Sequence, residues 1–254
     1  MKNLYSEHIT IKQSDIFIKT DLKPAIDEAL KSIRKNRKIL ENYIKLYPDF
    51  KTSFKPVKIK KDAPLVIRMM ALAAEKTEVG PMAAVAGALA DLGVDEMRNI
   101  GAKVCVIENG GEISAYSNIQ IDVGIYAGKS ILSEKIGFRL NTNDFPIGIG
   151  TSSGTVGHAF SYGIADAAIA IADNATLADA AATAIGNEVQ GKDLEKSIQN
   201  GLEIAETIEG VRGVFIILGD KAGTVGKLPQ LIKIKGKKGE LIKDKITELF
   251  KDIY

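Results

Sequence analysis

A chain of 254 residues, 45% hydrophobic and 26% charged, can fold around a core without a metal or a disulfide. Its formal net charge of +2 provides no strong basic field, which argues against nucleic acid as a partner. The N-terminus alternates polar with apolar residues, and the longest uncharged stretch, 145–165, is rich in Gly, Ser and Thr. Neither stretch resembles a secretory leader or a membrane span, so we expect a cytoplasmic protein.

The first third of the chain predicts a hairpin followed by two helices. Alternating apolar residues on both sides of 13–15 predict two strands within 6–22. Leu and Ile at helical spacing predict an amphipathic helix over 21–47. Asp62 is expected to cap a second helix, from about Pro64 to Lys76.

The rest of the chain mixes helices with strands, and a mainly antiparallel sheet packed with helices is the expected fold, of class α+β. Gly87 lies inside a predicted helix, which suggests close approach by another backbone or by a ligand. No repeat or linker marks a boundary, so one domain of residues 1–254 is expected, with the hairpin and helix of 1–60 as its only candidate subregion. The predicted helices are 82–97, 177–190, 193–208 and 240–250, and the predicted strands are 103–108, 113–116, 119–126, 137–140, 147–151, 165–172, 213–218 and 228–234.

The single cysteine, Cys105, lies in the apolar run from Val104 to Ile107. One cysteine excludes a disulfide framework and favours a reducing compartment. The simplest interpretation is a small buried hydrophobic residue.

Asp179 and Thr183 are four residues apart in an alanine-rich predicted helix, so they share one face. A carboxylate with a hydroxyl suits Mg²⁺, which takes one or two protein oxygens and completes its shell with substrate phosphates. The alternative is that the Thr183 hydroxyl bonds back to the carbonyl of Asp179 while the carboxylate is simply hydrated.

A loop of small residues offers unobstructed backbone N–H groups and several hydroxyls, the elements of an anion-binding nest. It is neither a Walker A motif nor a GxGxxG turn, and an ordinary Ser/Gly loop is the alternative. His158 follows it and could carry a proton or donate to a phosphoryl oxygen, whereas His8 is expected to be incidental. The candidate binding residues of this loop are Thr151, Ser152, Ser153, Gly154 and Thr155.

Asn109, Gly110 and Gly111 form a third candidate segment between two predicted strands. A tight turn alone would explain these three residues. The flanking Glu108 and Glu112 add charge that a turn does not require.

Four motifs in this order are similar to the ApbE-like branch of the flavin-transferase superfamily: VGPMAAVAGALAD (79–91), ENGGE (108–112), IGTSSGTVGH (149–158) and ADAAATAIGN (178–187). The resemblance implies an ApbE-like, T-fold-related α+β domain. It also implies Mg²⁺ and FAD, with Asp179 and Thr183 as metal ligands. Asp179 and His158 are the candidate catalytic residues. The flavin-nucleotide site would include Asn109, Gly110, Gly111 and Glu112 together with the five loop residues 151–155.

Two departures separate this chain from the flavin transferases. Glu112 stands where the family has Asp, one methylene shorter. The HxxDPRTG segment has no counterpart, because GTVGHAFSYG leads directly into a predicted strand. The fold and the metal site can therefore persist without transfer of FMN from FAD to a protein Thr or Ser.

Relatives of this branch in methanogenic archaea and other anaerobes are linked to sulfide assimilation and homocysteine formation. The resemblance therefore implies a small anionic or nucleotide ligand and, besides, protein partners of sulfur metabolism. The open alternatives are a ligand-binding enzyme, a noncatalytic accessory partner in sulfur assimilation, and an Mg²⁺-dependent FMN transferase. A homo-oligomer is compatible with each. Cys105 is a poor sulfur carrier, since Lys103 is the only basic residue near it in sequence.

Overall fold

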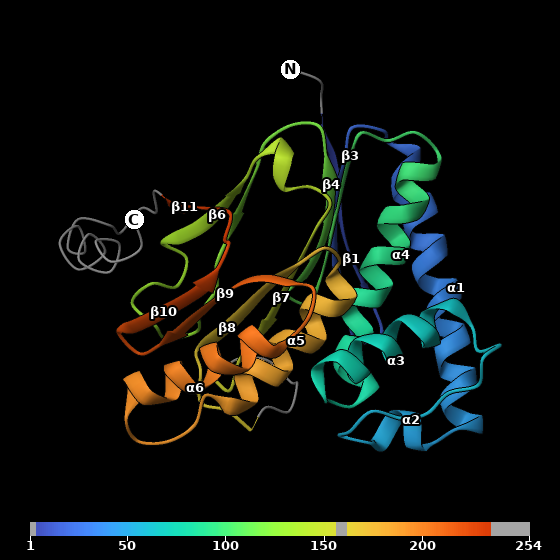
Figure 1. Ribbon diagram of the computed structural model, residues 1–254. Coiled ribbons are helices and arrows are strands. Elements are labelled where there is room, and N and C mark those ends of the chain that lie inside the picture. Colours follow the sequence, from blue (N-terminus) through green and yellow to red (C-terminus); the bar gives the residue numbers. More distant parts are fainter. Residues whose placement is uncertain (1–3, 156–161, 235–254) are drawn as a thin grey trace.

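A computed structural model describes residues 4–155 and 162–234 and shows a large sheet between a layer of helices and a small second sheet (Figure 1). The strands in the described part of the chain pair antiparallel, which confirms the expected α+β fold. The strands of the large sheet are, in spatial order, β1 (Tyr5–Ile11), β2 (Ser14–Thr20), β3 (Val104–Asn109), β4 (Glu112–Ser117), β7 (Ile147–Ser152), β8 (Ala167–Ala172), β9 (Val211–Leu218) and β10 (Lys221–Gly226). The small sheet has the order β11 (Gln230–Lys233), β6 (Ile136–Leu140) and β5 (Ile121–Gly124).

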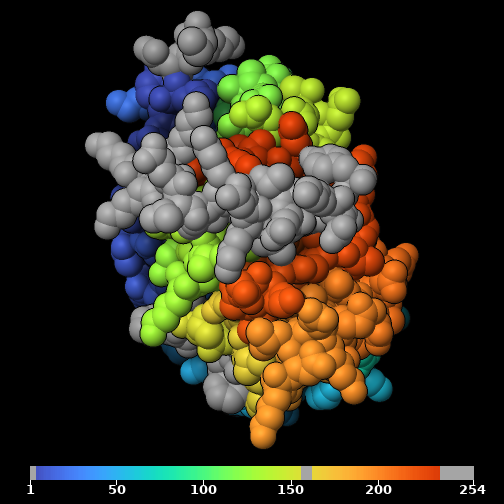
Figure 2. All heavy atoms as spheres, turned by 90° about the vertical axis from the view of Figure 1, so that its left-hand side faces the viewer, coloured from blue at the N-terminus to red at the C-terminus, as the bar shows by residue number. Residues whose placement is uncertain are grey.

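The helices cover one face of the large sheet, and the small sheet covers the other (Figure 1). Strand β8 shows why the layers form, since Ala168, Ala170 and Ala172 pack on the helices, whereas its two isoleucines pack toward the small sheet. In the space-filling view, the C-terminal strands in orange-red lie beside α6 in orange, which packs on β9 and β10 (Figure 2). The helices are α1 (Pro24–Leu46), α2 (Asp49–Thr52), α3 (Leu65–Thr77), α4 (Val85–Asn99), α5 (Ala175–Glu188) and α6 (Leu194–Thr207), with 3₁₀ turns η1 (Pro81–Ala84) and η2 (Thr142–Asp144).

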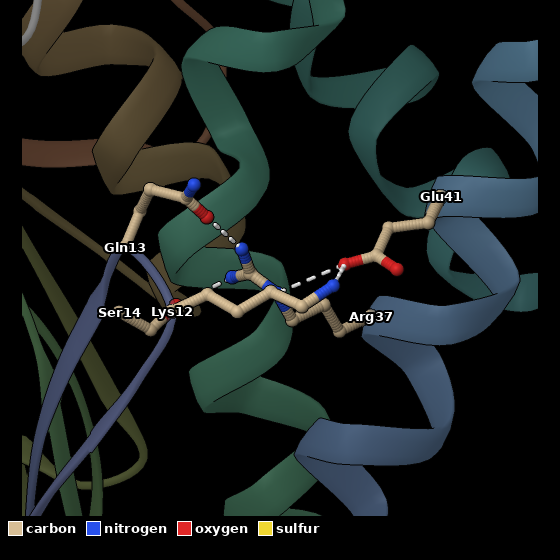
Figure 3. Close-up of polar contacts among 5 residues, drawn as sticks. All are labelled: Lys12, Gln13, Ser14, Arg37 and Glu41. Carbon is tan, nitrogen blue, oxygen red and sulfur yellow. Dashed lines mark hydrogen bonds and ion pairs between the residues drawn. The ribbon is translucent and has the colours of Figure 1, made fainter.

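Arg37 of α1 fastens the N-terminal hairpin to the helical layer (Figure 3). Its guanidinium donates to the Ser14 hydroxyl at 2.9 Å and to the side-chain carbonyl of Gln13. The same group pairs with Glu41 at 3.3 Å, and Lys12 pairs with the same carboxylate. The turn of the hairpin is therefore held between α1 and the strands that follow.

Most predicted elements are confirmed to within a few residues, and the main differences are as follows. Asp62 does not cap the helix predicted from Pro64, which is α3, because Pro64 occupies the N-cap position and makes no side-chain cap. The first residues of the predicted helix 82–97 belong to the 3₁₀ turn η1 instead, and α4 starts at Val85. The strand predicted over 119–126 is limited to β5, and α2 and β10 were not predicted. The helix predicted over 240–250 lies outside the described residues.

Among the described helices, none is both long and apolar enough to cross a membrane. The division of the chain into domains, including the subregion 1–60, stays a prediction.

Candidate functional site

The β3–β4 turn places Glu112 at the start of β4. Asn109 pairs with Glu112 across the hairpin, so Gly110 and Gly111 form the two-residue turn. Their φ angles of +71° and +121° lie in the region that glycine adopts at little cost. Asn109 is buried and donates from its side-chain amide to the carbonyl of Ala86 at 3.0 Å. The predicted turn is thereby tied to the start of α4.

Two glycines let α4, α5 and β7 approach at backbone distance. A Cβ at Gly150 of β7 would lie 2.2 Å from the carbonyl oxygen of Ala178 on α5. A Cβ at Gly87 of α4 would lie 2.1 Å from the carbonyl oxygen of Ala175. The close approach expected at Gly87 is therefore confirmed, with another backbone as the neighbour.

Helices α4 and α5 cap one another through two aspartates. The carboxylate of Asp179 on α5 accepts a hydrogen bond from the backbone N–H of Gly87 at 2.9 Å. The carboxylate of Asp91 on α4 accepts from the backbone N–H groups of Ala175 at 2.9 Å and Thr176 at 2.8 Å. Each carboxylate thus satisfies N–H groups in the first turn of the opposite helix, where negative charge is favourable.

Glu112 and Asp179 are two carboxyl groups with raised pKa values, and the charge of Glu112 acts on Asp179. Burial raises the pKa of Glu112 to about 7, although the backbone N–H groups of Glu112 itself and of Thr151 lower it in part. Burial, and then the charge of Glu112, raise the pKa of Asp179 well above its ordinary value, against the lowering effect of the Gly87 and Ala86 backbone. The β3–β4 turn, the end of β7 and the two helices therefore converge on one acidic site.

Thr183 lies one turn beyond Asp179, and both residues keep part of their surface accessible. Its hydroxyl makes no hydrogen bond to another residue in the described part of the chain, whereas Thr77 bonds back to the carbonyl of Ala73 at 2.8 Å. The alternative in which Thr183 bonds back to the Asp179 carbonyl is therefore not found. The carboxylate of Asp179 is not simply hydrated either, because it caps α4.

The Ser/Gly loop uses several of its polar groups within the protein. The N–H of Gly154 donates to the carbonyl of Ala165 at 2.9 Å, and the N–H of Thr155 donates to the Ser153 hydroxyl at 3.1 Å. The Thr155 hydroxyl donates to buried Asp166 at 3.1 Å. The backbone N–H of Thr151 hydrogen-bonds Glu112 and lowers its pKa in part. Thr151 is therefore the part of the loop that reaches the two carboxyl groups.

Two other members of the loop stand differently. The Ser152 hydroxyl faces α5, where a Cβ at Gly186 would lie 3.0 Å from it. His158 lies outside the described residues. Ligand binding by residues 151–155 and catalysis by His158 stay predictions.

The carboxylate of Asp179, the carboxylate of Glu112 and the hydroxyl of Thr183 are the oxygen donors available at this site. They suit Mg²⁺, because it needs few protein oxygens and because a cation would relieve the repulsion between the two carboxyl groups. In the described residues no group of three or more His, Cys, Asp or Glu is placed to hold a metal.

Cys105 is buried, and its Sγ lies 3.6 Å from the carbonyl oxygen of Ala102. Burial raises the pKa of its thiol to about 12. The interpretation of Cys105 as a small buried residue is confirmed, and its burial disfavours the thiolate at neutral pH.

Sequence reasoning missed Asp91, which is buried and also accepts hydrogen bonds from the hydroxyls of Ser114 at 2.7 Å and Thr176 at 2.6 Å. Two signals were present: Asp91 ends the motif VGPMAAVAGALAD (79–91), and it is the single acidic residue in the small and apolar run AVAGALADLG. A buried carboxylate in such a run requires several donors, but their identity depends on the fold.

The chain matches known proteins over most of its length. A protein-family model described as AbpE bacteria matches residues 2–224. A UPF0280 protein of Methanocaldococcus jannaschii is 43% identical over 231 residues, which cover 90% of this chain and 93% of that protein. A UPF0280 protein of Methanothermobacter thermautotrophicus is 41% identical over 228 residues, which cover 89% of this chain and 87% of that protein.

A solved structure shows the same fold. The crystal structure of the ApbE protein of Thermotoga maritima aligns with a TM-score of 0.54 at 12% identity, covering 89% of this chain and 97% of that one. The order of the motifs, the fold and the family model agree. The chain therefore belongs to the ApbE-like family that the model AbpE bacteria describes.

Proposed function

We propose that the chain binds an anionic, phosphorylated ligand of nucleotide or flavin type together with Mg²⁺, where Glu112, Thr151 and Asp179 meet. The observation that carries this proposal is the convergence of two carboxyl groups, Glu112 on β4 and Asp179 on α5, at the N-terminal turn of α4, with the pKa of each raised. Two neighbouring carboxylates, one buried and one half-buried, cost free energy unless a proton or a cation accompanies them. A cation with a phosphorylated ligand would supply the missing positive charge and complete its own shell with phosphate oxygens.

The residues of the site have distinct proposed roles. Asp179 and Thr183 would hold Mg²⁺, which when bound supplies positive charge that neutralises carboxylate and phosphoryl oxygens. Glu112 would hold or release a proton at its carboxyl oxygens, since its pKa of about 7 lies near neutral pH. Gly110 and Gly111 leave room for a ligand to approach the backbone, because no atom lies closer than 3.9 Å to a Cβ built at either residue. The hydroxyls of residues 151–153 would orient a phosphate, with His158 as proton donor.

FAD is the first ligand to test, because the resemblance to flavin transferases implies it. Two features of the sequence, Glu112 in place of Asp and the missing HxxDPRTG segment, depart from the flavin transferases. They bear on transfer of FMN and leave ligand binding open. We therefore propose binding as the function, and transfer of FMN to a Thr or Ser becomes an outcome of the experiment. The biological setting that we propose is sulfide assimilation and homocysteine formation in an anaerobe, beside separate catalytic proteins, and its support is the resemblance alone.

A direct test measures FAD binding by quenching of flavin fluorescence, with Mg²⁺ or with EDTA present. Wild type is compared with Asp179→Asn, with Thr183→Val and with Glu188→Gln, which removes an exposed carboxylate from the last turn of the same helix. We expect Mg²⁺-dependent binding in wild type and Glu188→Gln, and a loss of about tenfold or more in the two site variants.

The same samples separate the alternatives. Release of AMP with an acceptor peptide present would show that flavin transfer is retained. Binding of FAD that is equal in all four proteins, or independent of Mg²⁺, would contradict the proposed site. No binding of FAD, FMN or ATP by wild type would favour the noncatalytic accessory role.

A further inference from the structure

Asp91 of α4 joins the two elements that carry the carboxyl pair. Its Oδ1 accepts a hydrogen bond from the Ser114 hydroxyl on β4 at 2.7 Å. The same atom accepts from the Ala175 N–H at the start of α5 at 2.9 Å, and its Oδ2 accepts from the N–H and the hydroxyl of Thr176 at 2.8 and 2.6 Å. One buried carboxylate thus holds α4, β4 and α5 together.

Each bond of Asp91 lies close in sequence to a carboxyl group of the proposed site. Ser114 is two residues beyond Glu112 on β4, so the two side chains lie on the same face of the strand. Thr176 is three residues before Asp179 on α5, within the same turn of the helix. Asp179 in turn accepts from the N–H of Gly87, four residues before Asp91 on α4. The two caps are therefore reciprocal: Asp91 on α4 caps α5, and Asp179 on α5 caps α4.

We propose that Asp91 is a positioning residue, which sets the distance between Glu112 and Asp179 by fixing β4 and the first turn of α5 to α4. This inference rests on the proposed function for its consequence in ligand binding. Its structural part, the placement of Asp179 against Gly87, can be measured without a ligand.

The test compares Asp91→Asn with Ser32→Ala. An Asn side chain has one carbonyl acceptor, so it leaves some donors around position 91 without a partner. Ser32→Ala is the matched control, because the Ser32 hydroxyl makes a buried hydrogen bond of 2.9 Å to the carbonyl of Leu92, next to Asp91, but contacts neither β4 nor α5 through it. Ser114→Ala and Thr176→Val each remove one hydroxyl donor and provide milder variants if Asp91→Asn does not fold.

Amide hydrogen exchange is the first measurement. We expect faster exchange in Asp91→Asn at Ala175 and Thr176, whose N–H groups donate to Asp91, and also at Gly87, whose N–H donates to Asp179 and not to Asp91. The amide of Val94, inside α4, reports whether α4 itself has loosened, and it should exchange at the wild-type rate. The second measurement is Mg²⁺-dependent FAD affinity, which should fall about tenfold or more in Asp91→Asn and not in Ser32→Ala.

The outcomes are distinguishable. The positioning role would be overturned if Gly87 exchange and FAD affinity changed no more in Asp91→Asn, Ser114→Ala and Thr176→Val than in Ser32→Ala. The proposed function would still stand in that case. If wild type binds no FAD, the proposed function fails, and Gly87 exchange alone decides whether Asp91 positions Asp179.

Discussion

The carboxylate of Asp179 on α5 accepts a hydrogen bond of 2.9 Å from the backbone N–H of Gly87, 92 residues earlier in the chain. A side chain that is proposed to bind a cation is therefore also a helix cap. The two roles make different demands, because capping needs an acceptor oxygen and cation binding needs negative charge. Substitutions at position 179 can separate them.

Replacing Asp179 by Asn and by Ala should have different effects on stability. Asn keeps an oxygen acceptor for Gly87 and removes the charge next to Glu112, whereas Ala leaves the first turn of α4 without this cap. Since a lost cap costs about 1 kcal/mol, we expect Asp179→Asn to have the higher free energy of unfolding of the two by about that amount. Urea unfolding at pH 7 without Mg²⁺ measures the difference. Equal stabilities would show that the cap contributes nothing.

Glu112 should make the protein less stable as the pH rises through the weakly acidic range. Its pKa is about 7 in the folded protein against 4.5 ordinarily, so the folded state binds more protons than the unfolded state between these values. The free energy of unfolding therefore falls with rising pH, by at most about 3 kcal/mol from this group. The raised pKa of Asp179 acts in the same direction.

Glu112→Gln tests this pH dependence, because it removes the titrating group and also the charge that raises the pKa of Asp179. Urea midpoints at pH 5 and pH 7.5 should differ less in Glu112→Gln than in wild type. Glu188→Gln, on the exposed end of α5, should keep the wild-type difference. A wild-type slope that persists in Glu112→Gln would assign the pH dependence to other groups.

Local patterns predicted most of the fold, because alternation and helical spacing record which side chains face the core. The Gly110–Gly111 turn and the shared face of Asp179 and Thr183 follow from sequence spacing in the same way. Strand β10, KAGTVG, has too few large apolar residues to show alternation. The segment becomes a strand because it pairs with β9. Asp62 is of a residue type that is favoured at N-caps, but helix α3 begins at Leu65, directly after Pro64.

The polar contacts of the site could not be predicted, because they join residues far apart in the chain. Asp91 and Thr176 are 85 positions apart, and the convergence of α4 with α5 depends on glycines whose neighbours are known only in the folded chain. The Ser/Gly loop offered N–H groups for an anion, yet Gly154 and Thr155 use theirs within the protein. Composition shows which donors exist, and the fold decides which of them are occupied.

Cys105 should be unreactive in the folded protein. Its thiol is buried and has a pKa of about 12, so almost no thiolate is present at neutral pH. We expect no reaction with an aromatic disulfide reagent at pH 7.5 under native conditions, and one thiol per chain after unfolding in urea. Rapid labelling of the native protein would contradict the burial of Cys105 and would reopen a role in sulfur transfer.

Gly150→Ala should disturb the site more than the fold as a whole. The new Cβ would lie 2.2 Å from the carbonyl oxygen of Ala178 and 2.5 Å from the backbone nitrogen of Asp179, so β7 and α5 must separate locally. Overpacking of this kind costs about 1 to 3 kcal/mol, and here it also displaces Asp179 from Glu112. We expect a lower urea midpoint and a loss of Mg²⁺-dependent FAD binding that persists at low temperature, where the variant is fully folded.

Gly93→Ala is the matched control for this prediction. Its Cβ would lie 2.5 Å from Cδ1 of Ile107, the end of a flexible side chain that can turn away, and the substitution also favours the α4 helix. We expect this variant to bind FAD as wild type does. If Gly150→Ala binds FAD as tightly as Gly93→Ala, displacement of α5 from β7 has no effect on the two carboxyl groups. The contact between β7 and the first turns of α5 would then not determine the geometry of the site.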